Sequence, residues 1–160
     1  MCAMTIRDDL LKECAKAINF SVDAPVAIGG KYVPAVEDQG ILYISGQVAR
    51  VGDAIAVQGK VGQDVSPEQA KLAAQICLVR CLTIAYQRFG SLDAIEKALQ
   101  MTVHIQSDPH FHDLSEVSDG ASELLYDIFG DAGRHARTTV GVASLPKNST
   151  VEIDLSLRVK

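Results

Sequence analysis

The segment over residues 133–140 holds the side chains best suited to chemistry. It places His135 and Arg137 two positions apart at the start of a predicted strand, so both side chains share a face. Arginine stays charged, and its planar guanidinium holds a carboxylate through two hydrogen bonds, so Arg137 on the polar face of a sheet is a candidate clamp for a small anion. The alternative is a structural ion pair with Glu152 or Asp154 on the last predicted strand, and the pattern alone favours that ion pair.

The spacing of the histidines and cysteines does not predict a metal site. Cys77 and Cys81 stand four residues apart on a predicted helix with no second pair to complete a zinc site, so we expect buried thiols. His110 and His112 point in different directions at a helix start, and His104 lies on the polar face of a strand. The sequence also lacks a GxSxG motif and a phosphate-binding glycine loop, so we expect neither a metal nor another cofactor. We expect all the cysteines to be reduced: Cys2, Cys14, Cys77 and Cys81.

Short strands and two long helices must position these residues. Runs of β-branched residues and period-two alternation mark the strands, while Ser66-Pro67 followed by Gln69 marks the start of a long helix that stops at Gly90. In chain order we predict strands at 32–36, 41–45 and 54–58, a helix at 67–89, a strand at 97–106, a helix at 110–129, and strands at 136–143 and 151–159.

The alternation along these strands predicts the layers of the fold. Residues 151–159 alternate without a fault between apolar and polar side chains, and Leu99 and Met101 begin the apolar face of strand 97–106. The order βββαβαββ with right-handed crossovers predicts an α+β fold, in which a mixed sheet carries two helices on one face. The other, polar face is then either solvated or an oligomer interface.

We interpret the chain as a single domain over residues 1–160, with a helical extension over residues 1–24. Thr5 is placed to cap a helix that reaches about Ala17. The predicted apolar stripe of this helix consists of Ile6, Leu10, Cys14 and Ile18.

Composition narrows the classes of function. The 160 residues are 48% hydrophobic and 22% charged, as in ordinary globular proteins, and the net charge of -5 provides no excess of cations for a phosphate backbone. Nucleic-acid binding is therefore disfavoured. No apolar run is as long as the about 18 residues that a membrane-spanning helix needs. The N-terminal segment carries acidic residues where a signal peptide has basic ones. We expect a cytoplasmic protein that does not bind membranes.

Motifs at both ends of the chain resemble one family. Residues 136–146, ARTTVGVASLP, followed by VEID at 151–154, closely resemble the C-terminal signature of the Rid/YjgF family, also called endoribonuclease L-PSP. Residues 30–36, GKYVPAV, and 41–47, ILYISGQ, are similar to its N-terminal motifs, so that the resemblance covers about residues 25–160. The resemblance implies a chorismate-mutase-like fold and a homotrimer with ligand clefts between adjacent subunits.

The same resemblance implies a reaction and roles for particular residues. Deaminase members of the family hydrolyse small enamines and imines that carry a carboxylate, such as 2-aminoacrylate, to a keto acid and ammonia without a metal or cofactor. By matching position, Arg137 would hold the substrate carboxylate, and Glu152 would position or activate the attacking water. Tyr32 would line the cleft, and Gly46 would contribute backbone to its wall.

Departures from the family pattern keep alternatives open. Thr139 stands where many deaminase members have cysteine, Ser122 lies near the place of a common asparagine, and we count both among the substrate-binding positions. Besides the hydrolase, the sequence allows a non-catalytic trimer that binds a small keto or amino acid through Arg137. A third reading, endoribonuclease, comes from the family's name; the acidic charge disfavours it, and Arg134 and His135 are its only support.

Overall fold

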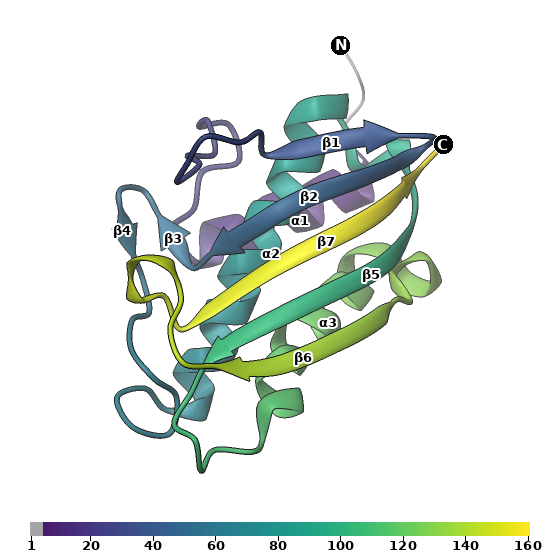
Figure 1. Cartoon of the computed structure of the whole chain (residues 1–160). Helices are drawn as coiled ribbons and strands as arrows, with labels where there is room; N and C mark the ends of the chain where they lie inside the picture. The colour runs from purple at the N-terminus through teal and green to yellow at the C-terminus, as the bar shows by residue number, and fades with distance from the viewer. Residues whose placement is uncertain (1–4) are drawn as a thin grey trace.

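The computed structural model describes residues 5–160, and Figure 1 shows a sheet with a layer of helices behind it. Cys2 lies outside the described residues. The helices are α1 (Ile6–Ala17), α2 (Pro67–Phe89) and α3 (Leu114–Phe129), with short 3-10 turns η1 (Leu92–Ala94), η2 (Gly130–Gly133) and η3 (Pro146–Asn148). The strands are β1 (Ala35–Asp38), β2 (Ile41–Val48), β3 (Arg50–Val51), β4 (Ala54–Ile55), β5 (Ile95–Gln106), β6 (Ala136–Val142) and β7 (Val151–Val159).

The main sheet has five strands in the order β1-β2-β7-β5-β6. The pair β5–β6 is parallel and the other pairs are antiparallel, so the sheet is mixed and the last strand of the chain lies at its centre. All three helices lie behind this sheet in Figure 1. The predicted α+β fold with its helices on one face is confirmed.

The third predicted strand differs from the prediction. Residues 54–58 do not join the main sheet, because the chain turns sharply at Gly52 (φ 58°) and β4 pairs with β3 in a separate two-stranded ribbon. The first predicted strand also starts later than expected, at Ala35, so Tyr32 lies in the preceding loop with 47% of its surface exposed.

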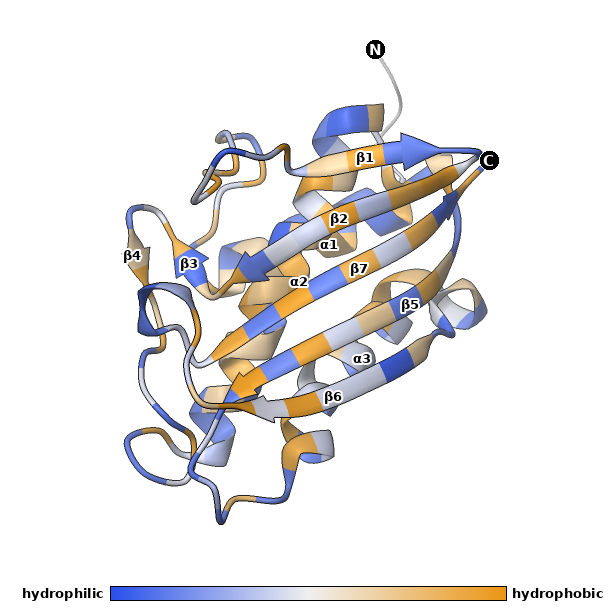
Figure 2. Ribbon diagram, viewed as in Figure 1, coloured by the Kyte–Doolittle hydropathy of each residue, from blue (hydrophilic) through white to orange (hydrophobic). Residues whose placement is uncertain are grey.

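Alternation along the central strand sets the two faces of the sheet. In β7 the residues Val151, Ile153, Leu155 and Leu157 are buried against the helices, while the residues between them are partly exposed. Figure 2 shows a matching alternation of hydropathy along β7. In β5 the predicted apolar face is broken, because a register shift between Ala98 and Gln100 buries Ala98 in place of Leu99.

Helix α2 lies against the back of the sheet and is buried along most of its length. Ser66 and Gln69 form the predicted capping box, and Gly90 ends the helix in the left-handed conformation (φ 79°). Cys77 and Cys81 donate hydrogen bonds to the backbone carbonyls of the central strand β7, and burial raises the pKa of both thiols. The prediction that these two cysteines are buried thiols is confirmed.

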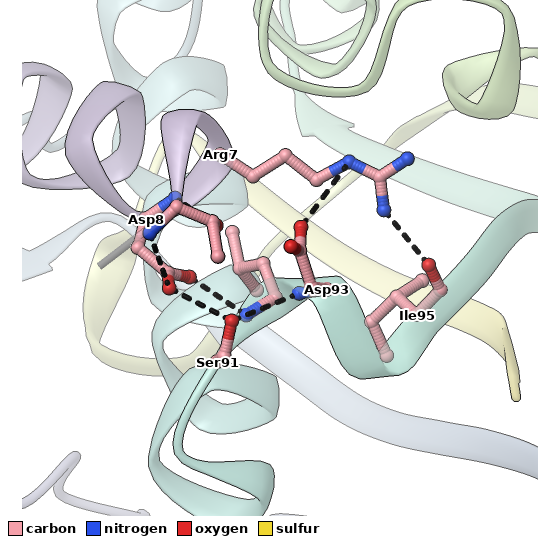
Figure 3. Close-up of polar contacts among 7 residues, drawn as sticks. Arg7, Asp8, Ser91, Asp93 and Ile95 are labelled. Atoms are coloured by element: carbon pink, nitrogen blue, oxygen red, sulfur yellow. Dashed lines mark hydrogen bonds and ion pairs between the residues drawn. The ribbon is translucent and has the colours of Figure 1, made fainter. Parts of the chain in front are cut away.

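Helix α1 docks on the helix layer through polar contacts as well as apolar ones. Of the predicted apolar stripe, Leu10, Cys14 and Ile18 pack partly buried against the core, but Ile6 is 79% exposed. The fully buried residues of α1 are Asp8, Leu11 and Ala15, so the stripe was predicted only in part. The reason is Asp8, which closes the capping box with Thr5 and also accepts a hydrogen bond from the backbone of Leu92 (2.7 Å). Asp8 accepts a second one from Ser91 Oγ (2.8 Å), as Figure 3 shows. These bonds turn the side of the helix that carries Asp8 toward the protein.

Helix α3 starts later than predicted. The Asp108 carboxylate accepts a hydrogen bond from the backbone of His110 (2.8 Å), and the Asp108 carbonyl accepts one from Phe111 (3.0 Å). These bonds close a turn in place of the first helical turn, so that α3 begins at Leu114. His110 and His112 therefore lie in a loop.

Candidate functional site

Three of the predicted site residues share one cavity. Tyr32, Gly46 and Glu152 line a cavity of about 170 Å³ at the end of β2, between the loop over residues 27–32 and the turn that precedes β7. A side chain at position 46 would overlap the Glu152 carboxylate, so glycine is needed for the two to lie side by side. The family-based grouping of these three residues thus agrees with their position in the fold.

Glu152 is the one acidic residue among the described residues that line this cavity. It lies on the front face of the sheet, opposite His104 on the neighbouring strand β5. Partial burial raises the pKa of Glu152, and the negative charge of Asp154 acts in the same direction, whereas His104 lowers it. A carboxylate with a raised pKa is a stronger proton acceptor than an exposed one, which suits general acid–base chemistry.

Arg137 belongs to a second group, at the edge strand β6. Its Nη1 donates to Asp119 Oδ1 (2.8 Å) and to Ser122 Oγ (2.9 Å), and its Nη2 donates to the carbonyl of Ser115 (3.4 Å). All three acceptors are on α3. Arg137 therefore points toward the helix layer, and its predicted place on the polar face of the sheet was wrong. The ion pair expected for this arginine exists, but its partner is Asp119 rather than Glu152 or Asp154.

Ser122 connects Arg137 to His135. Because Ser122 Oγ accepts from Arg137, its hydroxyl proton is free to be donated to His135 Nε2, at 3.0 Å. His135 Nδ1 lies 2.7 Å from the Gly133 carbonyl, which can only accept. Nδ1 of His135 therefore carries a proton. His135 and Arg137 share a face, as the sequence pattern predicted.

Thr139 extends the same group along β6. Its hydroxyl lies 2.9 Å from Ser118 Oγ, and Ser118 in turn donates to the Leu114 carbonyl (3.2 Å). Thr139 is thus held by a hydrogen bond to α3. Together the predicted residues form two groups, with Tyr32, Gly46 and Glu152 in one, and Ser122, Arg137 and Thr139 in the other.

The two groups do not meet within one chain. Glu152 lies on the front face of the sheet, whereas Arg137 and Thr139 point to the helices behind it. A site that uses both Arg137 and Glu152 therefore needs a second copy of the chain.

Several charged residues of these two groups were not singled out from the sequence. Asp119, the partner of Arg137, stands before a glycine in a helical segment and carries no motif. Arg50 and Arg80 line the cavity of Glu152 but are far apart in the sequence. Only the buried place of Arg80 on an apolar helix could have drawn attention to it, because an arginine in such a place needs acceptors for its hydrogen bonds.

Within residues 5–160 no three His, Cys, Asp or Glu side chains gather in a group that could hold a metal ion. No helix in the same part of the chain is long and apolar enough to cross a bilayer.

The fold is α+β, and a small cavity lies at the end of strand β2 of its sheet. Residues 22–158 match the Endoribonuclease L-PSP family. The chain belongs to this family, which is also known as Rid/YjgF.

Relatives of known sequence and structure agree with this assignment. Protein TCP17 of Trypanosoma cruzi is 31% identical over 86% of this chain and 86% of its own length. The crystal structure of Atu1372 from Agrobacterium tumefaciens, a protein of unknown function, is 34% identical, has a TM-score of 0.84, and matches over 96% of this chain and 94% of its own. Escherichia coli TdcF, solved with bound serine, shares the fold at 22% identity and a TM-score of 0.58, over 88% of this chain and 96% of its own.

Proposed function

We propose that the protein hydrolyses small enamines or imines that bear a carboxylate, giving a keto acid and ammonia. The observation that carries this proposal is Glu152, a half-buried carboxylate with a raised pKa in a cavity that also holds Tyr32. A cavity of about 170 Å³ is smaller than the sites that take drug-sized ligands, so it suits a substrate of a few carbon atoms.

The proposed reaction uses Glu152 as both a base and an acid. Glu152 accepts a proton from water as the water oxygen bonds to the carbon of the protonated imine, which gives a neutral carbinolamine. The same carboxyl group then gives this proton to the nitrogen, and the carbon–nitrogen bond breaks. Ammonia leaves, and the hydroxyl group passes its proton to Glu152 as the carbonyl forms. General acid–base help of this kind is worth about 10² to 10⁴ in rate.

Arg137 from a second copy completes the proposed site by holding the substrate carboxylate. The two faces of the sheet separate Arg137 from Glu152 in one chain, and β6, which carries Arg137, is an edge strand. A homotrimer with clefts between adjacent subunits would bring the two groups together. The serine in TdcF has a carboxylate next to an amine, which is also the pair of groups in the proposed substrates.

The test is the release of ammonia and pyruvate from 2-aminoacrylate generated in situ. Faster release than in a control without protein, lost in Arg137→Ala and in Glu152→Gln, is the expected result. Arg134→Ala is the matched control, because Arg134 is a neighbouring exposed arginine paired with Asp131. Sizing of the wild-type protein measures whether it is a trimer. No acceleration over the spontaneous reaction would contradict the proposal.

Binding without catalysis is the second candidate. Thr139, which stands in the place of a cysteine in many deaminases, has its hydroxyl within hydrogen-bond distance of Ser118. A protein that binds pyruvate or serine through Arg137 but does not accelerate hydrolysis would match this second candidate. The net charge of -5 gives no support to RNA cleavage.

A further inference from the structure

The cavity of Glu152 carries an excess of positive charge. Its charged lining residues are Arg50, Arg80, Lys147 and Glu152, three cations to one acid. Among residues 5–160 none of the three cations forms an ion pair with a carboxylate. Ion pairs within the described residues therefore do not neutralise these charges.

Arg80 is the most deeply buried of the three. Only 3% of its surface is exposed. Its guanidinium donates to the carbonyls of Ala27 (2.8 Å) and Arg50 (3.2 Å) and to Gln47 Oε1 (3.1 Å), while its Nε has no partner. These acceptors are neutral, so they fix the position of the group without cancelling its charge.

Arg50 adds a second uncompensated guanidinium beside the first. Its Nε is buried without a hydrogen-bond partner, and its positive charge lowers the pKa of Arg80, in the same direction as burial does. Two guanidinium groups that repel each other with no acid between them are stabilised by an anion. Lys147, on the exposed turn η3, closes the same cavity from the other side.

We propose that Arg50, Arg80 and Lys147 form a second anion subsite, so that the ligand of this protein is a small dicarboxylate. One carboxylate of the ligand occupies this subsite, and the reacting carbon then lies near Glu152 in the same cavity. The assignment deepens the proposed function and rests on it for the other carboxylate, which Arg137 of a second copy holds. A dicarboxylate is favoured over a phosphate because the cavity also holds an acid, Glu152, which repels a doubly charged group more strongly than a singly charged one.

The experiment compares two five-carbon keto acids by calorimetric titration of the intact protein. 2-Oxoglutarate and 2-oxopentanoate differ only in the terminal carboxylate. We expect 2-oxoglutarate to bind about tenfold more tightly, as a charge-assisted contact to arginine provides. Arg50→Ala should lower the affinity for 2-oxoglutarate to that for 2-oxopentanoate, and the affinity for 2-oxopentanoate should stay unchanged. Arg50→Lys should restore part of the difference in affinity between the two acids.

Two further variants separate the subsite from the fold and from the proposed function. Lys147→Ala changes an exposed side chain, so it reports on the subsite even if Arg50→Ala unfolds. Arg88→Gln removes an exposed charge outside the cavity lining and should leave both affinities unchanged.

The outcomes distinguish the subsite from the clamp. Equal affinity of the wild type for the two acids, or an equal loss of both in Arg50→Ala, overturns the subsite. Failure of both acids to bind overturns the subsite and the proposed function together. Binding of 2-oxoglutarate that depends on Arg50 but survives Arg137→Ala supports the subsite and refutes the role of Arg137.

Discussion

Asp119 is expected to compete with the ligand for Arg137. The Asp119 carboxylate lies 2.8 Å from Arg137 Nη1, where the carboxylate of a ligand would bind. A ligand must therefore displace Asp119 before it pairs with the arginine. Asp119→Asn removes the competing charge and should tighten the binding of a small carboxylate.

The magnitude follows from the exposure of the two side chains. Arg137 is 20% exposed and Asp119 is 46% exposed, so solvent screens the pair strongly. Exposed pairs are worth about 0.2 to 1 kcal/mol, and asparagine keeps an oxygen that still accepts a hydrogen bond. We therefore expect a gain of about 0.5 to 1 kcal/mol, or about a two- to fivefold lower Kd.

Calorimetric titration with pyruvate at low salt measures this change. Asp131→Asn is the matched control, because Asp131 also pairs with an arginine, Arg134, at 3.3 Å on the open surface and should not affect binding. The gain in Asp119→Asn should shrink as the salt concentration rises. Unchanged or weaker binding in Asp119→Asn would refute competition, and weaker binding would mean that Asp119 holds Arg137 in its binding position.

Four other predictions concern the stability of α1 and the carboxylate of the cavity. Asp8→Ala leaves the buried backbone amide of Leu92 without its acceptor and should lower the free energy of unfolding, measured in urea, by about 2 to 3 kcal/mol. The control Asp9→Ala changes an exposed residue and should lower it by less than about 1 kcal/mol. Equal losses would argue against the role of Asp8. Because the pKa of Glu152 is raised above 4.5, the acidic limb of the activity profile should lie above that value, and Asp154→Asn should move it to lower pH; an upward move would show that Asp154 does not repel Glu152. Because the pKa of Glu152 is higher in the folded than in the unfolded state, its ionisation lowers the free energy of unfolding at higher pH. Glu152→Gln should therefore be more stable than wild type at neutral pH, and no more stable below about pH 4, where Glu152 is protonated in both states. Gly46→Ala should displace the Glu152 carboxylate and lower activity, and unchanged activity would show that Glu152 has room to move.

Local patterns predicted most of the fold. The capping box at Ser66, the stop at Gly90 and the alternation of 151–159 depend on neighbouring residues, and all are present as expected. The errors arose where a distant contact decides the outcome. The face that α1 buries depends on the bonds of Asp8 to Ser91 and Leu92, which lie more than 80 positions away along the chain.

The candidate site was predictable only in part, for the same reason. Family motifs gave the residues, yet a motif does not say on which side of an edge strand Arg137 points. That depends on α3, whose Asp119, Ser122 and Ser115 carbonyl satisfy the guanidinium. Arg50 carries no motif at all, and its place in the cavity follows only from the tertiary structure.

The central position of β7 has a consequence for synthesis of the chain. β2 and β5 both pair with β7, which leaves the ribosome after all the other described strands. The hairpin β1–β2 therefore waits for roughly 100 further residues, on the order of 5 to 20 seconds of translation, with one edge unpaired. During this time an exposed strand edge can pair with another chain. The yield of folded protein should thus depend on the rate of elongation, and chains released before residue 151 cannot assemble the sheet.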